Sequence, residues 1–440
     1  MTTDTLPRTG RLLATAPDGS SDPGLAAHLA AHGPLVVPPR DDRAWSHTVW
    51  REVAESGLTG RGGGGFPAAA KWDAVTRSGR RPLVVVNAME GEPASAKDRT
   101  LLTRSPHLVL DGAEVAAALS GARQVVVCVA DDQDGVARAV ERAIAERDRA
   151  GRSRPVSVVR PPARYVAGEE SALAAWLEQG EALPALRVDK SVALRVGRRP
   201  VLVHNAETLA QVALVARHGA AWFRGRGTPE APGTTLVTVS GGVGRPSVVE
   251  VELGTPVVDV VAAAEPLGPV SGILLGGYGG AWLDPAHASV PYAPGPLRDV
   301  GATLGVGIVC VLPATSCGIA ETARIVRYMA GESAGQCGPC VFGLPAIADD
   351  LELLAAGRGD PAVLARLEDR CGAVAGRGAC RHPDGVVRLV RSALAVFADD
   401  VRDHAAGRPC AGRHAASVLR FPTGAPVGAP VTVTVRGGAA

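Results

Sequence analysis

The sequence of 440 residues predicts a multi-domain protein in which an α/β region is followed by a β-rich region and then by a helical one. Up to about residue 230, short apolar runs alternate with helical segments, which is typical of a parallel sheet covered by helices. From Thr234 to about residue 315, Val, Thr and Gly alternate between turn sequences. From Gly318 to Ala405 the apolar spacing is helical.

The first region is expected to contain four strands and five helices. The strands are predicted at residues 82–86, 124–130, 156–159 and 201–203. The helices are predicted at residues 45–55, 108–119, 135–149, 170–177 and 207–217. Because the strands are short and mostly apolar, we expect them to be buried, with Cys128 as a small hydrophobic core residue.

The later regions and the termini are predicted in less detail. A strand-like run at 307–312 contains Cys310, which is also expected to be buried. Helices are predicted at residues 319–329, 344–355, 361–368 and 386–404. Residues 1–40 are expected to form an irregular N-terminal lead, and residues 411–440 an irregular tail with one strand-like run at 431–435.

Composition and charge exclude several classes of protein. Apolar residues make up 46% of the chain, which is ample for packed cores. The 46 basic and 44 acidic residues leave a net charge of +2, which argues against nucleic acid as a partner. No apolar run approaches the roughly 20 residues that span a bilayer, and no secretory signal is recognised at the N-terminus. We therefore expect a cytoplasmic protein without a membrane span, in which disulfides are not expected.

A glycine-rich loop at residues 60–72 is the first candidate binding site. Its four consecutive glycines, Gly62 to Gly65, let backbone N–H groups approach a ligand closely. Pro67 suits the first turn of a following helix. The start of that helix, together with Arg61 and Lys71, favours an anionic group such as phosphate. The alternative is a flexible surface loop.

Three further turns lead towards helices. Residues 87–93, followed by Lys97-Asp98-Arg99, lie past the carboxyl end of a buried strand, where open α/β sheets bind ligands. Polar side chains there can face ribose hydroxyls or the edge of a flavin ring; the alternative is a solvated acidic loop. Residues 165–173 and 204–209 are strand-to-helix turns, for which helix capping and dipole stabilisation are the alternatives.

The cysteines in the helical region form the fifth motif. Cys337 and Cys340 are spaced C-x-x-C, and Cys380 follows forty residues later. This pattern in a context of small residues is typical of iron–sulfur or zinc ligation. The alternative is a set of buried thiols without a metal.

From about Ser56 to Cys410, the five motifs together resemble the NADH-binding FMN flavoprotein subunit of respiratory complex I. That module also occurs in NAD-linked hydrogenases and formate dehydrogenases. The resemblance implies a Rossmann-like FMN- and NADH-binding α/β domain at 41–232 and a soluble-ligand-binding β-grasp domain at 233–315. A helical domain with a [4Fe–4S] cluster follows at 316–410.

The resemblance also implies roles for individual residues. Positions matching the family's FMN site are Gly62, Gly63, Gly64, Gly65, Lys71, Asn87, Glu90, Tyr165, Gly168, Glu169, Asn205 and Thr208. Positions matching its nicotinamide nucleotide site are Phe66, Glu92, Glu170 and Arg187, and the cluster ligands are Cys337, Cys340 and Cys380. No side chain is catalytic, because NADH gives a hydride to FMN, which passes electrons one at a time to the cluster. A partner iron–sulfur electron-transfer subunit is implied, and the complex places the chain at the periphery of a membrane.

The chain departs from the family at several positions. Met89 replaces an acidic residue, His204 an asparagine, and Ala74 an aromatic residue. Ala334 stands where the family has a cysteine ligand, so the cluster set is incomplete. The site then has four alternatives: a [3Fe–4S] form, a fourth ligand from outside, recruitment of Cys317 or Cys371, or no cluster.

The departures leave two alternative functions beside the flavoenzyme. One is a non-catalytic assembly or ligand-binding subunit on the same scaffold. The other is a flavoenzyme that uses a donor other than NADH, because the altered residues lie mainly on the nucleotide side.

Overall fold

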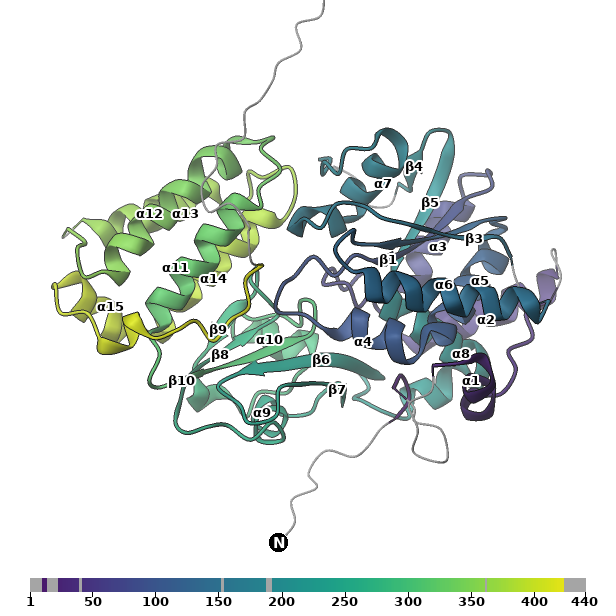
Figure 1. Ribbon diagram of the computed structural model, residues 1–440, viewed down its shortest axis with the longest axis horizontal. Helices are drawn as coiled ribbons and strands as arrows, with labels where there is room; N and C mark the ends of the chain where they lie inside the picture. The colour runs from purple at the N-terminus through teal and green to yellow at the C-terminus, as the bar shows by residue number, and fades with distance from the viewer. Residues whose placement is uncertain are drawn as a thin grey trace, which may run out of the picture.

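The computed structural model describes residues 10–13, 23–38, 42–151, 154–186, 192–360 and 362–422. It contains two five-stranded sheets. A group of helices, α11 to α15, packs beside them (Figure 1). The three parts follow one another in the chain in the predicted order: sheet with helices, second sheet, then helices.

The first sheet has the strand order β3-β2-β1-β5-β4. The central strand β1 (Leu83–Ala88) pairs in parallel with β2 (Val125–Val129) and with β5 (Arg199–Asn205). Strand β3 (Val156–Val159) pairs in parallel with β2. The short strand β4 (Leu194–Val196), which was not predicted, runs antiparallel to β5 at the edge. The parallel sheet expected from the alternation of strands and helices is confirmed.

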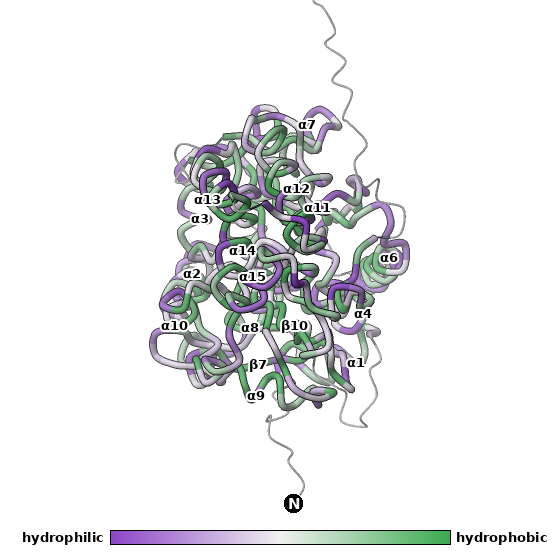
Figure 2. Tube along the Cα trace, turned by 90° about the vertical axis from the view of Figure 1, so that its left-hand side faces the viewer, coloured by the Kyte–Doolittle hydropathy of each residue, from purple (hydrophilic) through white to green (hydrophobic). Residues whose placement is uncertain are grey.

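Helices surround this sheet. They are α2 (Arg43–Ser56), α3 (Ala68–Thr76), α4 (Lys97–Arg104), α5 (Pro106–Ser120), α6 (Asp134–Arg149), α7 (Glu170–Gln179) and α8 (Ala206–Arg224), with a 3-10 turn η1 (Tyr165–Gly168) before α7. Helices α5 and α8 bury most of their residues, and their apolar side chains form one core with β1 and β2. Figure 2 shows hydrophobic segments gathered in the middle of the molecule. Cys128 is fully buried in β2, as predicted.

The second sheet has the order β7-β6-β10-β8-β9, with β10 parallel to β6 and antiparallel to β8. Its strands are β6 (Thr234–Gly241), β7 (Ser247–Glu252), β8 (Val270–Leu275), β9 (Ala281–Leu283) and β10 (Ile308–Pro313). Two short helices that were not predicted, α9 (Val257–Ala262) and α10 (Pro294–Asp299), join this part, together with the 3-10 turn η2 (Pro285–His287). Cys310 is fully buried in β10, as predicted.

The helical part begins after β10. Its helices are α11 (Gly318–Gly331), α12 (Leu344–Ala355), α13 (Val363–Val374), α14 (His382–Val396) and α15 (Ala398–Ala405), with a π-helical turn η3 (Pro339–Gly343) before α12 and a 3-10 turn η4 (Ala411–His414) after α15. The single helix predicted over 386–404 is wrong, because the helix is interrupted at Phe397, between the end of α14 and the start of α15. The Phe397 ring packs edge-on against Trp282 at 5.3 Å, so tertiary packing explains the break.

The N-terminal lead was expected to be irregular, and this is wrong for the residues that the structure describes. Helix α1 (Leu25–His32) lies within it, and His28 contacts Asp111 of α5 at 2.8 Å. Leu12 is fully buried in the first core. The strand predicted at 431–435 lies outside the described residues.

Candidate functional site

Four predicted turns meet where β1 and β5 end. Asn87 and Asn205 are register partners at the carboxyl ends of these parallel strands. The Asn87 amide donates to the Gly168 carbonyl at 2.8 Å, and the Asn205 amide donates to the Asn87 carbonyl at 3.4 Å. A Cβ built on Gly62 would lie 3.2 Å from the Cβ of Asn205. The glycine loop, the turn after β1, η1 and the turn after β5 therefore lie against one another.

The glycine loop turns its backbone towards open space. Residues 62–65 are exposed, and Gly63 and Gly65 have φ values of 95° and 59°, a conformation that side-chain-bearing residues rarely adopt. No heavy atom lies within 4 Å of a Cβ built on either of the last two glycines. Thr208, fully buried below, accepts the backbone N–H of Arg61 at 2.9 Å. Thr208 therefore holds the loop from beneath.

The cations beside this loop differ in their availability. Arg61, expected to favour an anion, is buried and donates to the Thr59 hydroxyl at 3.1 Å and the Thr234 carbonyl at 3.3 Å. That expectation is therefore wrong for its guanidinium. Lys71 is partly exposed, pairs with the Glu170 carboxylate and donates to the Val203 carbonyl at 3.3 Å. Of these two cations, Lys71 is thus the more exposed to solvent.

Glu90 uses its carboxylate to cap helix α4. It accepts the backbone N–H groups of Asp98 at 2.8 Å and Arg99 at 3.1 Å, and the Ser95 hydroxyl at 2.8 Å. Its own φ is 41°, a left-handed backbone conformation that is uncommon for residues other than glycine. Burial, and then the nearby Asp98 carboxylate, raise the pKa of Glu90. In the structure this side chain orders the turn after β1.

Glu169 caps helix α7 in the same way. Its carboxylate accepts the backbone N–H groups of Ser171 at 2.8 Å and Ala172 at 3.1 Å, and also the Ser171 hydroxyl. This is the capping alternative that the sequence left open. Contact of Glu90 and Glu169 with FMN stays a prediction, while their helix-capping roles are seen directly.

Glu92 connects this edge to the second sheet. Its Oε2 accepts the Tyr165 hydroxyl at 3.2 Å and the backbone N–H of Tyr278, just past β8, at 2.9 Å. Its Oε1 is buried and has no hydrogen-bond partner among the described residues. Burial raises the pKa of Glu92 to about 7, against the opposing hydrogen bonds from Tyr278 and Tyr165. Glu92 is therefore a buried acid that titrates near neutral pH.

A buried charge network positions Asn205, and the sequence did not reveal it. Lys97, 1% exposed, donates to Asp98 and to Glu207 at 2.8 Å each, and to the Asn205 Oδ1 at 3.3 Å. Burial alone would lower the pKa of Lys97, but the two carboxylates outweigh it and hold the pKa above its usual value. The other oxygen of Glu207 accepts two hydrogen bonds of 2.9 Å from the start of β6.

The residues that depart from the family pattern are mostly packed inside. Met89 is buried, and a Cβ built on Gly168 would lie 3.3 Å from the Met89 Cβ. His204 is buried edge-on to Trp72 at 6.0 Å, and burial and then the Lys71 charge hold its pKa well below the usual value. His204 is therefore neutral at physiological pH.

The structure places the predicted nucleotide residues in different surroundings. Glu92 is buried, Glu170 pairs with Lys71, and Phe66 is half-buried in the glycine loop. Arg187 lies outside the described residues. The structure therefore brings the predicted flavin residues together more completely than the predicted nucleotide residues.

The three predicted cluster ligands line one pocket. Cys337 and Cys340 come from the turn around η3, where the Cys340 N–H donates to the Cys337 carbonyl at 3.1 Å. Cys380 precedes α14. Ala334 also lines the pocket, so a methyl group stands where the resemblance implies a fourth thiolate.

His382 is a further side chain on this pocket wall that can bind a metal. Its Nε2 lies 2.8 Å from the Met329 carbonyl, which only accepts, so Nε2 carries the proton. Its Nδ1 is then a lone pair, buried and without a hydrogen-bond partner among the described residues. Neither Cys317 nor Cys371, the two thiols considered for recruitment, lines the pocket. Cys317 instead faces His404, with its Sγ 3.8 Å from the His404 Nε2.

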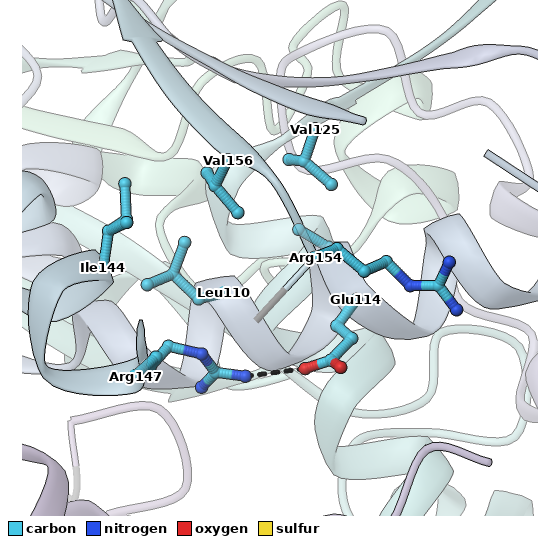
Figure 3. Close-up of a pocket in the computed structure, with 8 residues that line it drawn as sticks. Leu110, Glu114, Val125, Ile144, Arg147, Arg154 and Val156 are labelled. Atoms are coloured by element: carbon cyan, nitrogen blue, oxygen red, sulfur yellow. Dashed lines mark hydrogen bonds and ion pairs between the residues drawn. The ribbon is translucent and has the colours of Figure 1, made fainter. Parts of the chain in front are cut away.

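A second pocket lies elsewhere, between α5, α6 and strands β2 and β3 (Figure 3). Arg147 pairs across it with Glu114 at 2.8 Å, and its other walls are mainly aliphatic. None of the predicted site residues lines it. Arg147 also binds the buried Asp111 at 2.7 Å, so the ion pairs at this pocket join helix α6 to helix α5.

Comparison with known proteins agrees with this arrangement. Residues 53–214 match the family model of the Nuo51 FMN-binding domain, and residues 320–404 match that of the NADH-ubiquinone oxidoreductase-F iron-sulfur binding region. None of the described helices combines the length and the hydrophobicity needed to cross a membrane.

Relatives cover most of the chain. The F 2 subunit of NADH-quinone oxidoreductase in Rhizobium meliloti is 32% identical over 81% of this chain and 89% of its own length. The F subunit of the same enzyme in Mycobacterium bovis is 31% identical over 86% of this chain and 87% of its own length. A chain in the crystal structure of an air-oxidised NAD+-reducing [NiFe]-hydrogenase is 32% identical, with a TM-score of 0.74 over 82% of this chain. The match spans 63% of that hydrogenase chain.

The match in sequence and fold therefore extends from the glycine loop to the cysteine pocket, and the chain belongs to the family of the NADH-quinone oxidoreductase F subunits.

Proposed function

We propose that this chain oxidises NADH on a bound FMN and passes the electrons through an iron–sulfur cluster to a partner carrier. Membership of the NADH-quinone oxidoreductase family and the two matched family regions support this function. One observation carries it: η1 belongs to both candidate sites. Its Gly168 carbonyl accepts from Asn87 at the strand edge, and its Val166 lines the cysteine pocket.

The residues at the strand edge fit FMN. The open backbone of residues 62–65 offers N–H groups to a phosphate, and Lys71 supplies the positive charge. Asn87 and Asn205 lie at the strand ends, where amides suit the polar edge of a flavin ring. When bound, FMN supplies the exchange between a hydride and single electrons. This chain orders the turns around it through the caps that Glu90 and Glu169 provide.

The pocket residues fit an iron–sulfur cluster with a mixed ligand set. Three thiols line it, and the His382 Nδ1 is a buried nitrogen lone pair without a partner among the described residues. Imidazole replaces thiolate on iron in some clusters. We propose that His382 is the fourth ligand, in place of the thiolate that Ala334 lacks. The ring of His382 also lies edge-on to Tyr165 at 5.4 Å, on the side of η1.

The finer organisation is also proposed. Residues 41–232 form the FMN- and NADH-binding domain, 233–315 a β-grasp domain and 316–410 the cluster domain. An iron–sulfur partner subunit accepts the electrons, as expected in a larger oxidoreductase. The location of the chain in the cytoplasm, at the periphery of a membrane complex, stays a prediction.

Anaerobic spectroscopy of the purified full-length chain tests this function. The chain, supplied with FMN, iron and sulfide, should bind about one FMN, and NADH should bleach the flavin absorption. Lys71→Met should weaken FMN binding and leave iron content unchanged. If FMN binds but neither NADH nor NADPH bleaches it, the assembly-subunit alternative is favoured. If no FMN binds at all, the proposed function is wrong.

A further inference from the structure

Cys317, His404 and Cys410 form a second group of metal-binding side chains, separate from the cysteine pocket. Their Sγ, Nε2 and Sγ atoms all lie within 4.8 Å of one another. They come from the start of α11, the end of α15 and the segment that follows it. We propose that these three side chains bind a zinc ion, which fastens the C-terminal segment to the helical part of the protein.

The histidine is held in the tautomer that a metal requires. Its Nδ1 lies 3.1 Å from the Leu354 carbonyl, which only accepts, so Nδ1 carries the proton. The Nε2 lone pair accepts the Cys410 backbone N–H at 3.0 Å, and Nε2 lies 3.8 Å from the Cys317 Sγ, so this nitrogen is on the side of both cysteines. A ring N–H bonded to a backbone carbonyl is the usual way in which proteins orient a ligating histidine. His404 is fully buried, so its orientation is fixed by packing as well.

The spacing suits zinc. Zn–S bonds of about 2.3 Å and Zn–N bonds of about 2.0 Å place tetrahedral ligand atoms about 3.5–3.8 Å apart. The Cys317 Sγ lies 3.8 Å from the His404 Nε2. Two thiolates and an imidazole are a soft donor set that favours zinc over magnesium or calcium. Cys410 is only half-buried, which leaves room for a water as fourth ligand.

The present contacts show what binding has to change. The Cys410 backbone N–H donates to the His404 Nε2 at 3.0 Å, and the Ala320 N–H donates to the Cys317 Sγ at 3.4 Å. A zinc ion replaces the first of these bonds through a small shift of Cys410. Both thiols lose their protons to solvent, and no electrons move. The reaction therefore needs only Zn²⁺ and the protein.

The segment after Cys410 explains what the ion would stabilise. The Ser417 hydroxyl donates to Glu321 of α11 at 2.7 Å, and Arg324 donates to the Ala415 carbonyl at 3.0 Å. Further on, the Arg420 carbonyl accepts the hydroxyl of Tyr278, and the Phe421 ring packs against Tyr278 at 5.4 Å. The zinc site stands where this segment leaves α15, so it anchors one end.

Metal analysis of four full-length proteins tests the site. The wild type, dialysed against Zn²⁺ and then metal-free buffer, should retain about one zinc ion per chain in addition to its iron. Cys410→Ser, the least buried of the three, should lose that zinc and keep its iron. Cys337→Ser should lose its iron and keep the zinc, and Cys371→Ala should keep both the zinc and the iron. In Co²⁺-loaded wild type, visible bands typical of tetrahedral thiolate coordination should appear, and they should vanish in Cys410→Ser.

Three outcomes would overturn the proposal. Zinc that is lost in Cys337→Ser and kept in Cys410→Ser belongs to the cysteine pocket. A wild type without zinc has no such site. A mass lower by two hydrogens, with Cys317 and Cys410 joined in one peptide, identifies a disulfide instead. Limited proteolysis gives an independent reading, because zinc should slow cleavage within residues 410–422 in the wild type but not in Cys410→Ser.

Discussion

The strand edge and the cysteine pocket differ in how their polar atoms are used. At the strand edge, Glu90, Glu169 and Asn205 already bond to backbone or to neighbouring side chains. At the pocket, thiols line an open space, and the Nδ1 of His382 has no partner among the described residues. The strand edge is ordered by its own hydrogen bonds, whereas the pocket holds an imidazole nitrogen that has no partner in the described part of the chain. We therefore expect substitutions at the pocket to abolish a cofactor, and those at the edge to change stability or affinity by degrees.

The largest effect is expected at the cysteine pocket. Cys340→Ser should remove almost all iron and sulfide, because a thiolate cannot be spared from a set that already lacks one. Iron and sulfide per chain measure this, with the buried Cys128→Ala as control. Equal iron in Cys340→Ser and wild type would exclude the cluster.

The role of His382 has a sharper test. The reduced wild-type cluster should show nitrogen coupling in pulsed EPR, and His382→Ala should lose it. Ala334→Cys combined with His382→Ala should restore the iron content with thiolate ligands alone. Nitrogen coupling that persists in His382→Ala would contradict ligation by this residue.

The next effect is expected in the buried charge network. Lys97→Met leaves Asp98 and Glu207 without their cation and should lower the free energy of unfolding by about 3–5 kcal/mol. Urea unfolding measures this. Arg402→Met removes an exposed pair and should change stability by less than about 1 kcal/mol. Similar losses in the two variants would contradict the importance of burial.

Glu92 should make stability depend on pH. Its pKa is raised from 4.5 to about 7 in the folded protein, so its contribution is complete below pH 4.5 and is lost as the pH rises through 7. Glu92→Gln cannot ionise and should gain stability over the wild type between about pH 5 and pH 8, by up to about 3 kcal/mol. Thermal unfolding of the wild type and of Glu92→Gln at pH 5 and at pH 8 measures this. A difference in stability between the two proteins that is the same at both pH values would refute it.

The smallest effects separate two roles of the glycine loop. Gly65 has a φ of 59° and Gly64 does not have a positive φ, while a Cβ at either meets no atom within 4 Å. Gly65→Ala should therefore cost about 1–2 kcal/mol of stability. Gly64→Ala should leave stability nearly unchanged and weaken FMN binding, because its methyl group enters the open side. Unaltered FMN affinity in both variants would place FMN elsewhere.

Local patterns located four strands of the first sheet and its longer helices, because strand and helix periodicity follows from burial on one face, but they missed β4, α1, α9 and α10. The break at Phe397 could not be predicted, since it arises from packing against Trp282, over a hundred residues away. The same holds for the site. The glycine loop and the C-x-x-C spacing mark their places in the sequence. The burial of Lys97 could not be recognised from the sequence. The charged triplet Lys97-Asp98-Arg99 is expected to be solvated, and only the fold shows that Lys97 is enclosed.

The capping roles of Glu90 and Glu169 show a second limit. A motif located the right turn, but residue type alone did not distinguish a ligand contact from a helix cap, since one carboxylate serves either. Cys317, His404 and Cys410 are separated by up to 93 positions, so no spacing rule joins them.

The hydrogen bonds between helix α8 and strand β6 bear on how the protein can be divided for experiments. Glu207 accepts from Thr235 and Leu236, and Gln211 donates to the Thr234 carbonyl at 3.0 Å. A recombinant fragment ending at residue 232 would lack these partners in β6, and the fully buried carboxylate of Glu207 would be exposed to solvent. Flavin-binding work on an excised N-terminal half would then measure a damaged fragment, so truncation should begin beyond β10.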